Sequence, residues 1–138
     1  MSHPGQRAVS RDNLKLRLGR IAIAAVLAEV LGVLALVALV AIFGPPGFEA
    51  AKPFAERLGA WVGPISGFVL CVAGGYWVGK GAGPYYLGNG VAMGLAAALV
   101  DAASAVALGA SIHVLLVVSN VGRVLGGLLG GLLASRSR

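Results

Sequence analysis

The stretch IAIAAVLAEVLGVLALVALVAIF, residues 21–43, decides the fold of this chain. It is apolar or glycine throughout except for one carboxylate, Glu29. A helix needs about 20 such residues to cross a hydrocarbon core about 30 Å thick. Later stretches of similar length and character follow at 61–78, 85–108 and 112–134. The sequence therefore predicts an all-α integral membrane protein, a bundle of four transmembrane helices.

Composition supports the same class. The chain has 138 residues, of which 58% are hydrophobic and 12% charged, and its mean hydropathy is +0.89. Soluble domains are about half apolar and a quarter charged, so an ordinary soluble domain is excluded. The organisation we expect is a basic arm (1–20), a transmembrane domain (21–134) with an outer surface segment (44–60), and a short tail (135–138). The first span is longer than the about 7–15 residues of a signal-peptide core, so we interpret it as an uncleaved helix.

Basic residues are concentrated on one side of the predicted spans. They precede the first span, separate the second from the third, and follow the fourth: Arg7, Arg11, Lys15, Arg17, Arg20, Lys80, Arg136 and Arg138. The positive-inside rule then puts both termini in the cytoplasm, and we expect a bacterial cytoplasmic membrane. We interpret the net charge of +6 as a topology signal and expect no nucleic-acid partner. Contact of the arm with anionic lipid is the alternative.

The segment KPFAERLGAW, residues 52–61, follows the first span. Pro53 suits the first turn of a helix, and Phe54, Leu58 and Trp61 share one helical face. We expect a short helix lying on the outer membrane surface as an anchor, with a partner contact as the alternative.

Glycine and other small residues recur every four residues in the last three spans. This spacing allows close helix approach and predicts glycine-zipper packing. The predicted packing positions are Gly63, Gly67, Gly75, Gly79, Gly90, Gly94, Gly122, Gly126 and Gly130. Because these seams outnumber what one small bundle needs, we expect one to face a second copy or a larger membrane complex.

Glu29, Asp101 and Arg123 are the residues charged at neutral pH that fall well inside the spans. A lone charge at mid-membrane costs roughly 3 kcal/mol or more, so charges there are paired or functional. Arg123 falls between the two acids in predicted depth. We therefore expect an intramembrane charge cluster, either a structural ion pair or part of a proton or solute path.

A polar face extends this prediction along the fourth span. His113, Asn120 and Arg123 share one helical side, and Ser104 lies one turn from Asp101. The arrangement we expect is an ion pair plus amide hydrogen bonds that fix how the helices dock; the alternative is a polar track that runs through Asn120 to the charge cluster.

Catalytic, metal and cofactor chemistry are not indicated. The chain has two histidines, too few for a clustered zinc site, and no credible nucleophile–base–acid set. The stretch GGYWVGKG, residues 74–81, has P-loop spacing but glycine at the position that needs Ser or Thr, so we expect no nucleotide.

The stretch LAEVLG, residues 27–32, resembles the first helix of small multidrug resistance transporters, which are four-helix proteins of similar size. The resemblance implies that Glu29 binds protons and cationic substrates in an antiparallel dimer. It covers six residues, while the basic arm, the long segment 44–60 and Arg123 depart from the pattern, so we assign no family.

The function we expect is that of a non-enzymatic accessory or scaffold subunit that acts through helix–helix association in the lipid bilayer. The alternative is a small proton-coupled transporter or channel that uses Glu29, Asp101 and Arg123.

Overall fold

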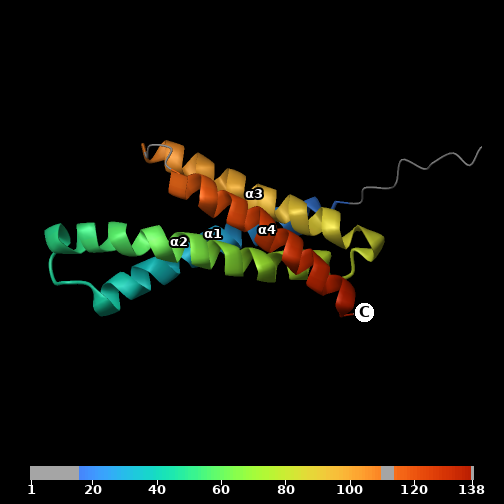
Figure 1. The fold of residues 1–138 in the computed structure, drawn as a ribbon, viewed down its shortest axis with the longest axis horizontal. Coiled ribbons are helices and arrows are strands. Elements are labelled where there is room, and N and C mark those ends of the chain that lie inside the picture. Colours follow the sequence, from blue (N-terminus) through green and yellow to red (C-terminus); the bar gives the residue numbers. More distant parts are fainter. Residues whose placement is uncertain (1–15, 110–113, 138) are drawn as a thin grey trace, which may run out of the picture.

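The computed structural model describes residues 16–109 and 114–137, and all regular structure in these ranges is helical. Four long helices follow one another: α1 (Leu18–Phe43), α2 (Phe48–Gly79), α3 (Tyr86–Ala107) and α4 (Val114–Arg136). A short 3₁₀-helix, η2 (Gly83–Tyr85), precedes α3. Each long helix is long and apolar enough to cross a membrane (Figure 1). The prediction of an all-helical chain with four potential spans is confirmed.

Helix α2 differs from the prediction at its start. Residues 48–60 are not a separate surface helix but the first turns of one continuous helix of 32 residues. At about 1.5 Å per residue this helix is about 48 Å long, more than the hydrocarbon core needs. Pro53 and Pro64 lie inside it. Each proline removes only one backbone hydrogen bond, a loss that long membrane helices tolerate.

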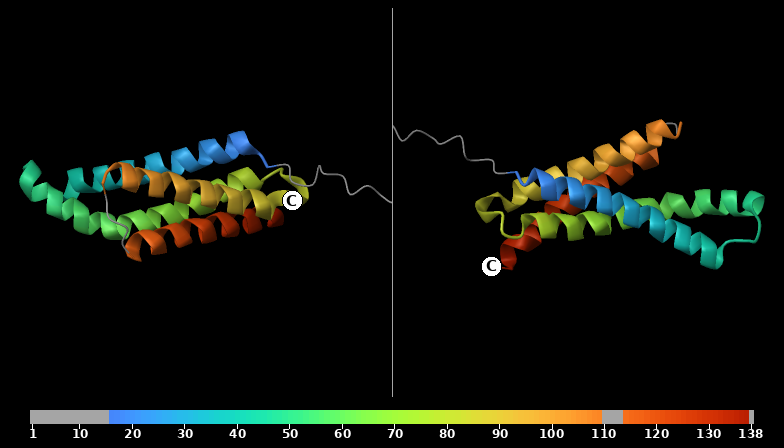
Figure 2. Two further views of the ribbon diagram at one scale, coloured as in Figure 1. Left: turned by 90° about the horizontal axis from the view of Figure 1, so that it is seen from above. Right: turned by 180° about the vertical axis from the view of Figure 1, so that it is seen from behind.

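The helices form two hairpins that are packed at one end and separate toward the other. In Figure 1, and from behind in Figure 2, the α3–α4 pair separates from the α1–α2 pair at the end of the bundle where α1 connects to α2. Contact is most extensive between α2 and α4, and α1 packs on α2 and α3. Helix α1 is therefore the least embedded element of the bundle.

The packed end contains the hydrophobic core. Its buried members come from the first half of α1, the second half of α2 and the first twelve residues of α3. They are Ile21, Ala24, Ala25, Ala28, Cys71, Val78, Met93 and Ala97. Most are small, which lets the backbones approach. Large apolar side chains instead face outward along α1, where Leu18, Val33 and Ile42 are 60–69% exposed. Such a surface suits lipid rather than water.

Glycine contacts within the chain are closest between α4 and its neighbours α2 and α3. A Cβ added at Gly75 would lie 2.5 Å from the carbonyl oxygen of Gly127, and one at Gly94 would lie 2.6 Å from that of Arg123. Gly67, Gly79, Gly90, Gly126 and Gly130 also meet close neighbours in this chain. Gly63 and Gly122 depart from the predicted seams, because a Cβ there would meet no atom within 4 Å. Gly63 borders a hollow instead.

Candidate functional site: an intramembrane charge cluster

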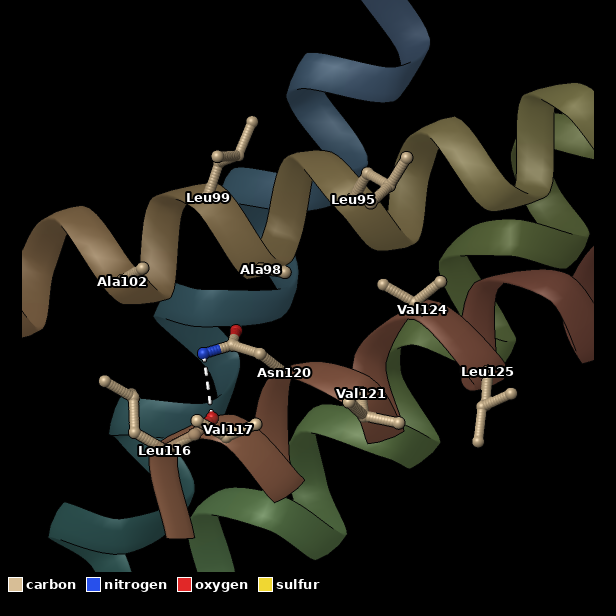
Figure 3. A pocket seen from close by; sticks show the side chains of 10 residues that line it. All are labelled: Leu95, Ala98, Leu99, Ala102, Leu116, Val117, Asn120, Val121, Val124 and Leu125. Atoms are coloured by element: carbon tan, nitrogen blue, oxygen red, sulfur yellow. Dashed lines mark hydrogen bonds between the residues drawn. The ribbon is translucent and has the colours of Figure 1, made fainter. Parts of the chain in front are cut away.

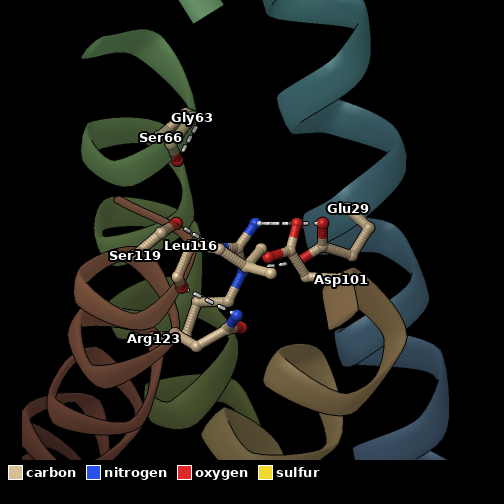
Figure 4. Close-up of polar contacts among 8 residues, drawn as sticks. Glu29, Gly63, Ser66, Asp101, Leu116, Ser119 and Arg123 are labelled. Carbon is tan, nitrogen blue, oxygen red and sulfur yellow. Dashed lines mark hydrogen bonds and ion pairs between the residues drawn. The ribbon is translucent and has the colours of Figure 1, made fainter. Parts of the chain in front are cut away.

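The three predicted intramembrane charges meet in the bundle, and we call Glu29, Asp101 and Arg123 the charge cluster (Figure 4). Arg123 of α4 donates from Nε to Glu29 Oε1 at 2.7 Å and from Nη2 to Glu29 Oε2 at 3.1 Å. Its Nη2 also donates to Asp101 Oδ1 at 3.0 Å. One guanidinium on α4 therefore joins α1 to α3, with a two-pronged geometry that favours arginine over lysine.

Two residues that the sequence did not assign to the charge cluster hold the guanidinium in place. Ser119, one turn before Arg123, accepts a hydrogen bond from Nη1. Gly67 of α2 lies against the guanidinium, since a Cβ there would come within 3.0 Å of Arg123 Cζ. The i, i+4 spacing of Ser119 and Arg123 was the available sequence signal for the first contact. No sequence signal identified which small residue of α2 faces the arginine.

The charges are buried to different degrees. The side chain of Arg123 is 5% exposed, whereas those of Glu29 and Asp101 are 17% and 23% exposed. With both acids ionised the cluster has a net charge of −1. The cation is thus enclosed, and the excess negative charge lies on the more accessible groups.

Hollows adjoin the charge cluster on the side away from the core. One of about 110 Å³ is lined by all three charged residues together with Ser66 and Gly67. A second of about 430 Å³ is lined by Asp101, Ser119 and Arg123, and by apolar residues near the start of α4 and the end of α3. Asp101 and Arg123 border both. The separation of the two hairpins therefore leaves the cluster open toward one end of the bundle.

The predicted polar face is divided in the structure. Ser104 shares a hollow of about 330 Å³ with Glu29. Asn120 instead faces α3 in an open groove of about 530 Å³ between α3 and α4, which the charge cluster does not line (Figure 3). His113 lies outside the described residues. Among the described residues Asn120 does not lead to the charge cluster, so the alternative of a track through it is not supported there, because Ser119, not Asn120, lies on the side of α4 that carries Arg123.

The groove between α3 and α4, which we call the α3–α4 groove, is apolar apart from Asn120. Its walls are Leu95, Ala98, Leu99, Ala102, Leu116, Val117, Val121, Val124 and Leu125. Asn120 donates from Nδ2 to the carbonyl oxygen of Leu116 at 2.9 Å. Its Oδ1 is buried and has no hydrogen-bond partner in the described chain. An unsatisfied buried acceptor costs about 1–3 kcal/mol, which makes this side chain exceptional.

Comparisons of the chain with protein-family models, with curated proteins and with solved structures found no match. Within residues 16–109 and 114–137, no three His, Cys, Asp or Glu side chains gather as a metal site would require. A proposal about the function of this chain therefore rests on the geometry of the charge cluster and of the α3–α4 groove.

Proposed function

We propose that this chain is a small multi-pass membrane subunit without enzymatic activity that acts by helix–helix association. The α3–α4 groove is its association surface, and a second copy of the chain is the partner. The observation that carries the proposal is the unsatisfied Asn120 in an otherwise apolar groove.

The chemistry of an asparagine side chain favours a like partner. An amide has two donors and one acceptor, and one donor of Asn120 is used within α4. Two copies that face each other across a twofold axis bring identical surfaces together. A rotation of each Asn120 amide would turn its buried Oδ1 toward the partner's second Nδ2 hydrogen, so that each amide donates to the other. Asparagine hydrogen bonds between membrane helices contribute about 0.6–2 kcal/mol.

The shape of the groove supports the same proposal. Its floor on α3 contains Ala98 and Ala102, which allow close approach, and its rim contains exposed Leu99 and Val121. Small residues below and larger apolar residues above are a combination that suits a packed helix.

We further propose that glycine zippers pack α2, α3 and α4 within each copy and that both termini are cytoplasmic in a bacterial inner membrane. The close contacts of Gly75 and Gly94 and the basic residues near both termini support this arrangement. In this arrangement most of the predicted seams pack within one chain, so the groove rather than a spare glycine seam contacts the partner.

Disulfide cross-linking in native membranes tests the association. In a Cys71→Ala background, single Leu99→Cys and Val121→Cys substitutions put a thiol on the groove, and Val37→Cys puts one on the exposed face of α1. We expect dimers from the two groove variants, none from Val37→Cys, and loss of dimer when Asn120→Leu is added. Monomer alone, equal cross-linking at all three positions, or an adduct with another protein would contradict the proposal.

A proton-coupled transporter or channel is the second candidate, and the hollows beside the charge cluster favour it. Asp101, the more exposed acid, is the group that a proton or solute would meet first. Proteoliposomes loaded with a pH-sensitive dye test this function. Protein-dependent proton flux that Asp101→Asn abolishes would support it, and flux equal to that of empty liposomes would exclude proton transport.

A further inference from the structure

We propose that the end of the bundle where α1 begins and α2 ends binds the headgroup of an anionic phospholipid. The site is formed by Arg17, Arg20 and Lys80, with Arg20 stacked on Trp77 and Lys80 over Tyr76. The inference is independent of the association proposed above, since these residues lie outside the α3–α4 groove.

The basic residues at this end have no acidic counterpart in the described chain. Of the acids that the structure describes, Glu29 and Asp101 belong to the charge cluster, and Glu49 and Glu56 lie in the first turns of α2 at the opposite end. The ion pairs found in the described residues are those of Arg123. Among residues 16–109 and 114–137, no carboxylate therefore pairs with these three cations.

The arginines are held in fixed positions rather than extended freely into solvent. The backbone N–H of Arg17 donates to Asn89 Oδ1 at 2.9 Å, which ties the start of α1 to α3. The Arg17 guanidinium donates to the carbonyl oxygens of Gly81 at 2.7 Å and Lys80 at 3.4 Å. These contacts keep one cation beside the turn that follows α2, where the helix carbonyls favour positive charge.

Aromatic contacts hold the other two cations. The guanidinium of Arg20 stacks on Trp77, with Cζ 4.3 Å from the ring centroid, and Lys80 Nζ lies 5.7 Å from the ring centroid of Tyr76. Stacking covers one face of the guanidinium and leaves its edge N–H groups for an anion. Tryptophan and tyrosine are the side chains enriched at the headgroup level of a membrane.

The adjoining surface suits the rest of a lipid. Ile23 and Leu27 follow Arg20 at i+3 and i+7 on α1, and both are about half exposed. A phosphate held by the basic residues thus has an apolar strip directly below it for an acyl chain. This continuity favours a phospholipid over a free inorganic anion.

The test measures the thermal stability of full-length, delipidated protein in neutral detergent, with phosphatidylglycerol, phosphatidylcholine or inorganic phosphate added. We expect stabilisation that saturates with phosphatidylglycerol, weakens with salt, and is absent with the other two probes. Equal stabilisation by phosphatidylcholine, or saturable stabilisation by inorganic phosphate, would overturn the proposal.

Charge variants locate the site. At about 1 kcal/mol per basic residue, Arg20→Gln/Lys80→Gln should weaken phosphatidylglycerol binding about 25-fold. The matched variant Lys52→Gln/Arg57→Gln removes two charges at the opposite end, and Arg7→Gln/Arg11→Gln removes two from the arm. Equal weakening by all three pairs would refute a specific site.

A second variant applies if Arg20→Gln/Lys80→Gln does not fold. Arg20→Lys keeps the charge without the planar stack and should retain most of the phosphatidylglycerol binding. Complete loss of binding in that variant would also refute the proposal.

Discussion

The charge cluster makes a quantitative prediction about the effect of one substitution in two backgrounds. Glu29→Gln should destabilise the native chain, in which Glu29 makes two hydrogen bonds to Arg123. The same substitution should be neutral or stabilising in an Arg123→Gln background. There, Glu29 and Asp101 are left as two carboxylates without a cation, so removal of one relieves an uncompensated charge.

The expected magnitudes follow from burial and pairing. Arg123 is 5% exposed and joins two acids, so Arg123→Gln should cost about 3–5 kcal/mol, the range for breaking a buried ion pair. Glu29→Gln leaves the Arg123–Asp101 pair intact and should cost about 1.5–3 kcal/mol, the range for hydrogen bonds to charged groups. The coupling energy between the two positions should therefore be at least about 1.5 kcal/mol.

The free energy of unfolding can be measured by titrating detergent micelles with dodecyl sulfate and following tryptophan fluorescence. A matched control is Glu56→Gln and Arg57→Gln, exposed positions on α2 where each change should stay within about 0.5 kcal/mol. If Glu29→Gln costs the same in both backgrounds to within about 0.5 kcal/mol, the pairing described here does not stabilise the fold and the reasoning fails.

The same titration and the cross-linking assay check three further predictions. Gly75→Val should cost about 2–3 kcal/mol, because its Cβ would lie 2.5 Å from a backbone oxygen that cannot yield, whereas Gly122→Val should have little effect; equal effects would refute the packing argument. Gly67→Val should displace the Arg123 guanidinium and reduce the Glu29–Arg123 coupling by more than half, and an unchanged coupling would contradict that contact. Asn120→Leu should abolish cross-linking in the groove without lowering stability in dodecyl sulfate, because it removes an unsatisfied buried oxygen; a loss above about 1 kcal/mol would indicate a structural role.

An all-helical chain with four potential membrane spans could be predicted from the sequence because these features depend on local composition. The span 21–43 is apolar over the thickness of a membrane whatever it packs against, and the other three spans share this property. The three charges inside the potential spans were also identifiable, since a charge inside a long apolar run has few alternatives to a partner. The contact of Arg123 with both acids agrees with the depths estimated by counting residues.

The tertiary structure decided which side chains face one another. Ser119 and Asn120 are neighbours in sequence, yet one binds Arg123 and the other lies in the α3–α4 groove, because 100° of helix rotation separates them. Likewise, Gly67 faces the guanidinium while Gly63, one turn away, borders a hollow where the hairpins separate. Periodicity defines the sides of each helix, but which side meets a neighbour depends on how the helices rotate and cross, and only the packed bundle sets those angles.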